Sequence, residues 1–126
     1  MYFVYVLRCV GSSLYCGWTT DVANRIKAHT GEIPGGAKYT RGHPPVRAEA
    51  VWSAVSKESA MRLESFIKKL KKTEKERLII DPDCFSELFE GRLDISDFKR
   101  EPEFEKDIAE VSRGNMESVA RVPQDK

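Results

Sequence analysis

Two short apolar runs near the N-terminus, YFVYVL at residues 2–7 and LYCGW at residues 14–18, decide the fold of this chain. Both runs are rich in aromatic and β-branched residues, which favour strands buried in a sheet. The segment between them contains Gly11 and two serines, a composition typical of turns. We therefore predict an antiparallel hairpin at the start of the chain.

Two helices follow from apolar spacing and capping residues. Thr20 or Asp21 can cap a helix over residues 22–29, and Ser56 can cap another over residues 57–71. The second helix carries its apolar residues at helical spacing, which predicts a buried stripe of Ala60, Leu63, Ile67 and Leu70.

The remaining elements complete a β-β-α-β-α-α order. Residues 46–52 alternate imperfectly and predict a third strand, and TEKE at residues 73–76 matches a capping box for a short third helix. Residues 30–45 are rich in glycine and proline, and we expect an ordered surface loop there. The sequence thus predicts an α+β domain with a small three-stranded antiparallel sheet flanked by helices.

The charge is distributed unevenly along the 126 residues. The formal net charge is +1, yet residues 1–72 carry +7 and residues 73–126 carry −6. This asymmetry indicates a nucleic-acid-binding surface followed by an acidic appendage, the alternative being a chance excess of solvated charge. We expect a core domain over residues 1–80 and an acidic, partly helical C-terminal extension over residues 81–126 whose last dozen residues are loosely ordered.

Composition excludes several classes of protein. No run approaches the roughly 18 apolar residues of a membrane span, and the opening run lacks the basic flank of a signal peptide. The three cysteines form no C-x-x-C pair, and with only two histidines they predict no zinc site. We therefore expect a reduced, cytoplasmic protein without membrane contact.

Three polar residues lie at positions where they could take part in catalysis or metal binding. Arg25 and His29 are four residues apart, so they share one face of the first helix. Taken singly they could be a surface arginine and a buried, hydrogen-bonded histidine. Glu64 lies at the border of the apolar stripe, where a carboxylate needs a partner. It could be a metal ligand or an acid–base group, or it could form an ion pair with an arginine such as Arg25.

Tyr5 and Tyr15 lie in the two hairpin strands. Tyrosines in strands commonly serve packing alone. Together with an arginine, a histidine and one carboxylate at a metal ion, however, they could hydrolyse a phosphodiester, which needs a base, a cation for the developing charge and a metal ligand.

Two basic segments are candidate nucleic-acid contacts. GGAKYTRG at residues 35–42 combines flexible backbone with Lys38, Tyr39 and Arg41, which suits a loop that follows the backbone and stacks on bases. A solvated loop is the alternative. Lys68 and Lys69 belong to a basic helix end, which the helix dipole also favours whatever the function.

These motifs together resemble the GIY-YIG nuclease family, and in particular the small stand-alone prokaryotic proteins of the YhbQ-like group, which are akin to the nuclease subunit of structure-specific resolvases. Tyr5 matches the tyrosine of the first half-motif, in which Val4 replaces the isoleucine and Phe3 the glycine. Tyr15 and Gly17 match the second half-motif, in which Cys16 replaces the isoleucine. The resemblance covers residues 1–78.

The resemblance implies divalent-metal-dependent cleavage of DNA, by Mg²⁺ or Mn²⁺, in repair or recombination and on single-stranded or branched substrates. It implies that Tyr5 or Tyr15 activates water, Arg25 stabilises the charge on the phosphate, His29 assists, and Glu64 anchors the metal. Many members also carry an asparagine about a dozen residues after the glutamate, which this chain lacks.

That departure leaves a non-cleaving nucleic-acid-binding module as the alternative function. A third reading makes the acidic extension the functional element, either docking a partner protein or covering the basic face.

Overall fold

The computed structural model describes residues 1–108 and confirms the α+β class. The strands form one antiparallel sheet, in the order β2-β1-β3-β4: β1 (Tyr2–Cys9), β2 (Leu14–Thr19), β3 (Pro45–Ala54) and β4 (Phe98–Arg100). The predicted hairpin is confirmed, with Tyr5 of β1 opposite Gly17 of β2. β2 lies at one edge of the sheet, so no further strand pairs with its outer side.

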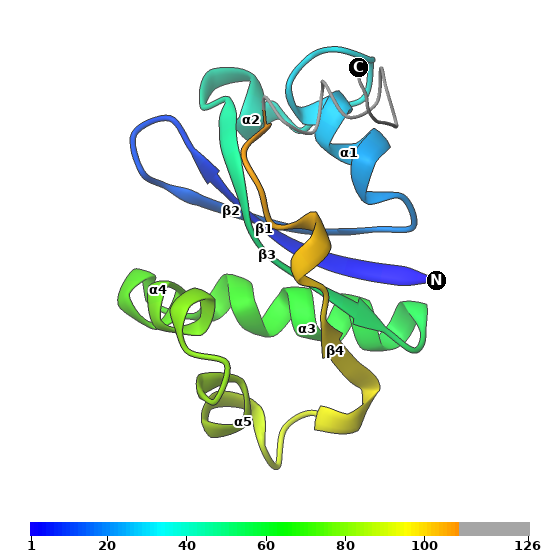
Figure 1. Ribbon diagram of the computed structural model, residues 1–126, viewed down its shortest axis with the longest axis vertical. Helices are drawn as coiled ribbons and strands as arrows, with labels where there is room; N and C mark the ends of the chain where they lie inside the picture. The colour runs from blue at the N-terminus through cyan, green and yellow to red at the C-terminus, as the bar shows by residue number, and fades with distance from the viewer. Residues whose placement is uncertain (109–126) are drawn as a thin grey trace.

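Helices cover both faces of the sheet (Figure 1). One face carries α1 (Val22–His29) and α2 (Lys38–Gly42), and the other carries α3 (Lys57–Lys69), α4 (Lys72–Ile80) and α5 (Cys84–Phe89). Ala60, Leu63 and Ile67 of the predicted stripe are buried, whereas Leu70 is half-buried and caps the helix, which ends two residues earlier than predicted. None of the helices within residues 1–108 has the length and apolarity to cross a membrane.

Alternation along β1 separates two hydrophobic cores. Val4 and Val6 face α3, whereas Tyr5 and Leu7 face α1. This follows from the period of two in a strand, because successive side chains point to opposite faces. The alternation therefore directs the Tyr5 side chain toward the helix that carries the predicted arginine and histidine.

The acidic extension supplies a fourth strand that the sequence did not predict. β4 pairs antiparallel with β3, with Trp52 opposite Arg100. β4 is only three residues long, so its alternation of side chains is too short to be recognised in the sequence. The three-stranded sheet is therefore corrected to four strands, while the division at residue 80 stays a prediction.

Two local predictions are also corrected. Residues 38–42 of the expected loop form the short helix α2. Helix α4 starts at Lys72, and its capping carboxylate is Glu74, which accepts a hydrogen bond of 2.9 Å from the Lys71 backbone N–H. The capping box thus lies two residues earlier than the TEKE pattern indicated.

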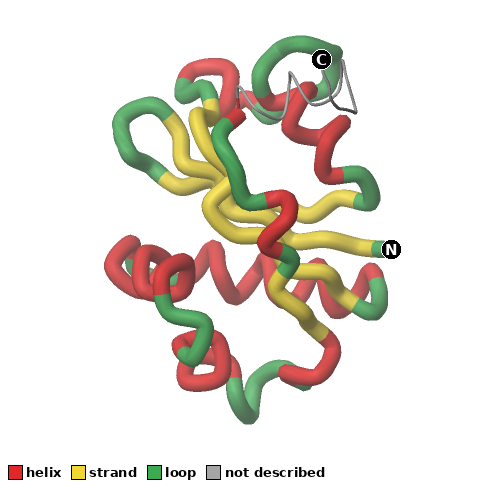
Figure 2. The backbone as a smooth tube through the Cα atoms, viewed as in Figure 1, coloured by secondary structure: helices red, strands yellow, loops and turns green. Residues whose placement is uncertain are grey.

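Residues 98–108 run back along β3 toward its first residues and α2 (Figure 2). The Val51 backbone N–H donates to the Glu105 carboxylate at 3.0 Å, and the Phe104 ring packs on the ring of Phe3 at 5.4 Å. The Arg100 guanidinium pairs with Glu105 and also donates to the Ile79 carbonyl at 3.0 Å. The Glu105 carboxylate, one of the acidic groups of the extension, therefore helps to attach the extension to the core.

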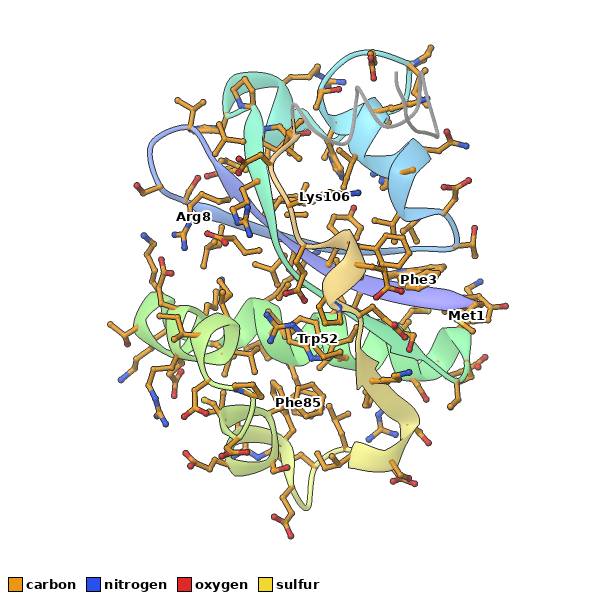
Figure 3. All side chains as sticks on the ribbon, in the orientation of Figure 1. Met1, Phe3, Arg8, Trp52, Phe85 and Lys106 are labelled. Atoms are coloured by element: carbon orange, nitrogen blue, oxygen red, sulfur yellow. The ribbon has the colours of Figure 1, made fainter. Side chains whose placement is uncertain are left out.

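Figure 3 shows two other anchors of the lower layer, Arg8 near α4 and the neighbouring rings of Trp52 and Phe85. Arg8 donates to Glu76 of α4 with both terminal nitrogens. The extension is partly helical as expected, with α5 and a 3₁₀ turn that ends at Phe104, and its last dozen residues lie outside the described residues.

Candidate active site and nucleic-acid interface

Tyr5, His29 and Arg25 converge on the α1 face of the sheet. The Tyr5 hydroxyl lies 2.8 Å from Nε2 of His29, and Nε of Arg25 lies 3.4 Å from the same hydroxyl. The first distance is a good hydrogen bond and the second a long one. The predicted grouping of these three side chains is therefore present, and both helical residues reach the one hydroxyl because they are a turn apart.

His29 is held from its other side by α2. Its Nδ1 lies 2.9 Å from the hydroxyl oxygen of Thr40, which also lies 2.9 Å from the Ala37 carbonyl oxygen. His29 and Thr40 are the buried polar residues of this core, at 3% and 1% exposure. Their hydrogen bonds explain how polar groups can be buried here, since a buried polar group without a partner is costly.

Gly17 makes room for the Tyr5 side chain. A Cβ built at this position would lie 2.4 Å from the Tyr5 hydroxyl oxygen. Because real Cβ contacts are longer than 3 Å, any side chain at position 17 must displace the tyrosine. The glycine of the second half-motif therefore has a steric role in the site.

Burial shifts the ionisation of both members of the Tyr5–His29 pair. Desolvation raises the pKa of Tyr5 well above its usual value of 10.0, against a smaller opposite effect from Arg25. Desolvation and, to a smaller extent, the charge of Arg25 together lower the pKa of His29 to about 4. Both groups are consequently neutral at pH 7, with a phenol facing a free imidazole.

The lowered pKa of His29 predicts a pH dependence of stability. Since the folded state binds this proton less readily than the unfolded state, neutral His29 contributes stability that is complete above about pH 6.5 and lost as the pH falls toward 4. We expect the free energy of unfolding in urea to fall more between pH 7 and pH 5 for the native sequence than for His29→Gln. Equal falls would contradict the shifted pKa.

An aromatic stack extends from the site toward the solvent. The Tyr15 ring packs edge-on to His29 at 5.0 Å and stacks with Tyr39 at 6.0 Å, and Tyr39 stacks with His43 at 4.3 Å. The Tyr39 hydroxyl donates to Ser13 at 2.5 Å. Both faces of Tyr39 are thus covered by rings, and the exposed end of the stack is His43.

A groove of about 280 Å³ crosses the β2 edge and connects the two faces of the sheet. Tyr15 and Tyr39 line it from the α1 side, and Lys68 of α3 and Lys75 of α4 line it from the other side. Cations beside aromatic rings suit a polyanion with stacking bases. The edge position of β2 makes this possible, since no further strand closes the sheet there.

Glu64 lies on the α3 side of this edge, apart from the Tyr5 cluster. Its carboxylate is 21% exposed and lies 3.5 Å from Nζ of Lys68, one of the groove cations. Burial and, to a smaller extent, the negative charge of Glu64 together raise the pKa of the neighbouring Cys16 thiol to about 12. Within residues 1–108 no ion pair joins Glu64 to Arg25, so the partner expected of the carboxylate is Lys68.

One carboxylate at a cationic groove fits a magnesium ion. Mg²⁺ typically binds proteins through one or two carboxylates and completes its shell with waters and substrate phosphates. Within the described residues no cluster of three His, Cys, Asp or Glu side chains offers an all-protein site. A metal here would therefore depend on Glu64 and on the substrate.

The other predicted nucleic-acid contacts are spread over the surface. Lys38 is exposed beside Tyr39, and Arg41 lines a hollow of about 570 Å³ with residues 30–36. Lys69 places its ammonium 6.0 Å over the Phe66 ring, away from the groove that Lys68 lines. Consecutive helical residues differ by about 100° in direction, which separates the two lysines.

Sequence reasoning missed four residues of the site: Thr40, Lys75, His43 and Gly36. Thr40 lay in the recognised loop motif, but only a helical turn brings its hydroxyl to His29. Gly36 allows that turn to approach α1, because a Cβ there would lie 2.3 Å from the Ala28 carbonyl oxygen. Its position after another glycine was the one available signal.

Comparison with known protein families finds a match over the part of the chain that carries this site. Residues 1–77 match the family model described as the GIY-YIG catalytic domain. The chain belongs to the GIY-YIG family. Tyr5, Tyr15, Arg25, His29 and Glu64 all fall inside the matched residues of this GIY-YIG protein.

The GIY-YIG chain has small stand-alone relatives. It is 49% identical over 78 residues to UPF0213 protein BH0048 of Halalkalibacterium halodurans, covering 62% of this chain and 81% of the relative. It is 39% identical over 95 residues to a UPF0213 protein of Clostridium perfringens, covering 75% and 100%. A solution NMR structure of the UPF0213 protein BH0048 from Bacillus halodurans matches 70% of this chain and 97% of that chain, with 44% identity and a TM-score of 0.42.

Proposed function

We propose that this GIY-YIG protein is an endonuclease that hydrolyses DNA phosphodiester bonds with Mg²⁺ or Mn²⁺. The observation that carries the proposal is the Tyr5 hydroxyl placed between a neutral imidazole and a guanidinium. A hydroxyl so placed can take a proton from water while His29 takes its own, and the arginine can meet the charge of a phosphate.

Arg25 controls access to this hydroxyl in the proposed reaction. Tyr5 is only 1% exposed, whereas Arg25 is partly exposed and its Nη1 donates to the Gly35 carbonyl at 2.7 Å. A substrate phosphate would compete for the guanidinium and draw it from Tyr5, with which it makes the long contact. Arg25 would then stabilise the phosphate while the Tyr5 hydroxyl becomes accessible to the attacking water.

Tyr15 and Glu64 complete the proposed machinery. Tyr15 packs on His29 and lines the groove, so it would hold the network rather than accept the proton. Glu64 would hold the metal ion, with Lys68 turning from the carboxylate to the DNA backbone. When bound there, the metal would supply positive charge to the phosphate oxygens.

The groove favours DNA with unpaired bases, single-stranded or branched, as the substrate. Its cations lie beside the Tyr15–Tyr39–His43 stack, whose exposed end can receive a base while the cations bind the backbone, so that affinity should fall steeply with salt. Lys38, Arg41 and Lys69 would add peripheral backbone contacts. A role in repair or recombination and a cytoplasmic location belong to the same proposal.

The test is cleavage of labelled single-stranded, duplex and flap DNA with Mg²⁺ or Mn²⁺. We expect metal-dependent cleavage, with Arg25→Ala and Glu64→Ala each lowering the rate by about 10²-fold, the cost of losing one charge-stabilising group. Arg62→Ala, which removes an exposed cation of α3 whose guanidinium donates to the Arg92 carbonyl at 3.4 Å, serves as the charge control. Cleavage that survives both substitutions would sink the proposal.

A non-cleaving DNA-binding module is the second candidate. The missing asparagine after Glu64 and the ion pair of Glu64 with Lys68 both favour it, because they leave a metal with little protein coordination. Salt-sensitive DNA binding without turnover in either metal would establish this reading.

We also propose that the acidic extension recruits a partner protein. Because β4 and Ile108 belong to the sheet and the core, and residues 109–126 hold equal numbers of acidic and basic residues, the test is replacement of exposed carboxylates within residues 81–108 rather than truncation.

A further inference from the structure

The hydrogen bonds around Thr40 fix where the proton of His29 lies. A carbonyl oxygen only accepts, so at 2.9 Å the Thr40 hydroxyl must donate its single proton to Ala37. The same hydroxyl oxygen lies 2.9 Å from Nδ1 of His29 and has no proton left to give. Nδ1 must therefore be the donor, and His29 carries its proton on Nδ1.

This assignment sets the direction of the next bond. A neutral imidazole with a proton on Nδ1 has a lone pair on Nε2, which faces the Tyr5 hydroxyl at 2.8 Å. The phenol must donate to that lone pair, and Arg25 donates to the phenol oxygen. All four bonds then run one way, from Arg25 through Tyr5, His29 and Thr40 to the Ala37 carbonyl.

We propose that Thr40 is a positioning residue that holds His29 in the Nδ1–H tautomer, so that Nε2 can receive the proton of Tyr5. The proposal rests on the proposed nuclease function. With the opposite tautomer, Nε2–H would point at the tyrosine oxygen and the histidine could accept nothing from it. Thr40 touches neither substrate nor metal and acts through the ring alone.

The proton step balances without any further reactant. One O–H bond of water breaks as a new O–H bond forms on Tyr5, and the original Tyr5 O–H bond breaks as Nε2–H forms on His29. The electron pair left on the water oxygen forms the bond to phosphorus, and the departing DNA oxygen leaves with the electrons of the broken P–O bond. The imidazolium then returns its proton to solvent.

The local fold provides for this role. Thr40 is the one buried residue of α2, at 1% exposure, and its bond to Ala37 spans three residues back to the residue that caps the helix. A five-residue helix gives little stability by itself. Its position against α1 is therefore best explained by what it presents to His29.

The proposal is tested by measuring which ring nitrogen of His29 carries the proton. Long-range ¹H–¹⁵N spectra of the full chain should show a protonated Nδ1 and an unprotonated Nε2 for His29 at pH 7. Thr40→Ser keeps the hydroxyl and should keep this signature, whereas Thr40→Val keeps the shape, removes the acceptor and should shift the ring toward Nε2–H. Cleavage should fall by about 10²-fold in Thr40→Val and less than about threefold in Thr40→Ser, since misdirected proton transfer costs that order of rate.

Each outcome decides the matter. A protonated Nε2 in the native protein overturns the proposal even if no variant folds, as does an unchanged Nδ1–H signature in a folded Thr40→Val protein. A tautomer change in Thr40→Val with no cleavage by any protein would leave the assignment standing and overturn the nuclease function. Equal cleavage by the valine and serine variants would remove the positioning role.

Discussion

Tyr5→Phe should lower DNA cleavage by about 10³- to 10⁴-fold, the upper range for losing a proton-transfer group. The substitution removes the oxygen that links water, His29 and Arg25 and leaves the ring in place. Because the raised pKa of Tyr5 keeps the phenol protonated near neutrality, the reaction needs the hydroxyl as a relay to His29. The measurement is the single-turnover cleavage rate at saturating enzyme.

Tyr15→Phe is the matched control for this variant. Tyr15 lies in the same hairpin and packs on His29, but within the described residues its hydroxyl has no hydrogen bond to the protein. We therefore expect a smaller loss than for Tyr5→Phe. A larger loss for Tyr15→Phe, with both proteins folded by urea unfolding, would make Tyr15 the residue that accepts the proton of water.

Gly17→Ala should lower cleavage by about 10³-fold. Its Cβ would lie 2.4 Å from the Tyr5 hydroxyl oxygen and 2.6 Å from Cζ, so the ring must move by roughly 1 Å, which breaks the bond to His29. A shift of that size in a reacting group costs about 10²-fold, and losing the relay entirely costs up to about 10⁴-fold. The expected value lies between these limits.

A double-mutant cycle separates this mechanism from general damage. If Gly17→Ala acts through the Tyr5 hydroxyl, adding it to Tyr5→Phe should lower cleavage little further, because the relay is already absent. If the cleavage losses of the two single variants instead multiply in the double variant, the alanine disturbs something else in the hairpin. DNA binding in Ca²⁺, where cleavage is not expected, would show whether the groove still forms.

The sequence determined the elements that depend on local pattern. The strands around Tyr5 and Tyr15, the helix carrying Arg25 and His29, and the buried stripe of α3 all follow from periodicity and capping over adjacent residues. The grouping of Tyr5 with Arg25 and His29 was expected from the family resemblance alone, and its physical cause, the alternation along β1, is visible only in the structure. The family resemblance also identified these tyrosine, arginine and histidine residues as candidates for the site.

Tertiary structure alone decided how the remaining parts meet. β4 is too short to have a pattern and exists because the β3 edge offers unpaired backbone groups. The groove exists because β2 ends the sheet, and the partner of Glu64 depends on which residues surround that edge. The role of Thr40 depends on hydrogen bonds across elements, which periodicity cannot encode. Local pattern thus fixed what each segment is, and packing fixed which polar atoms became partners.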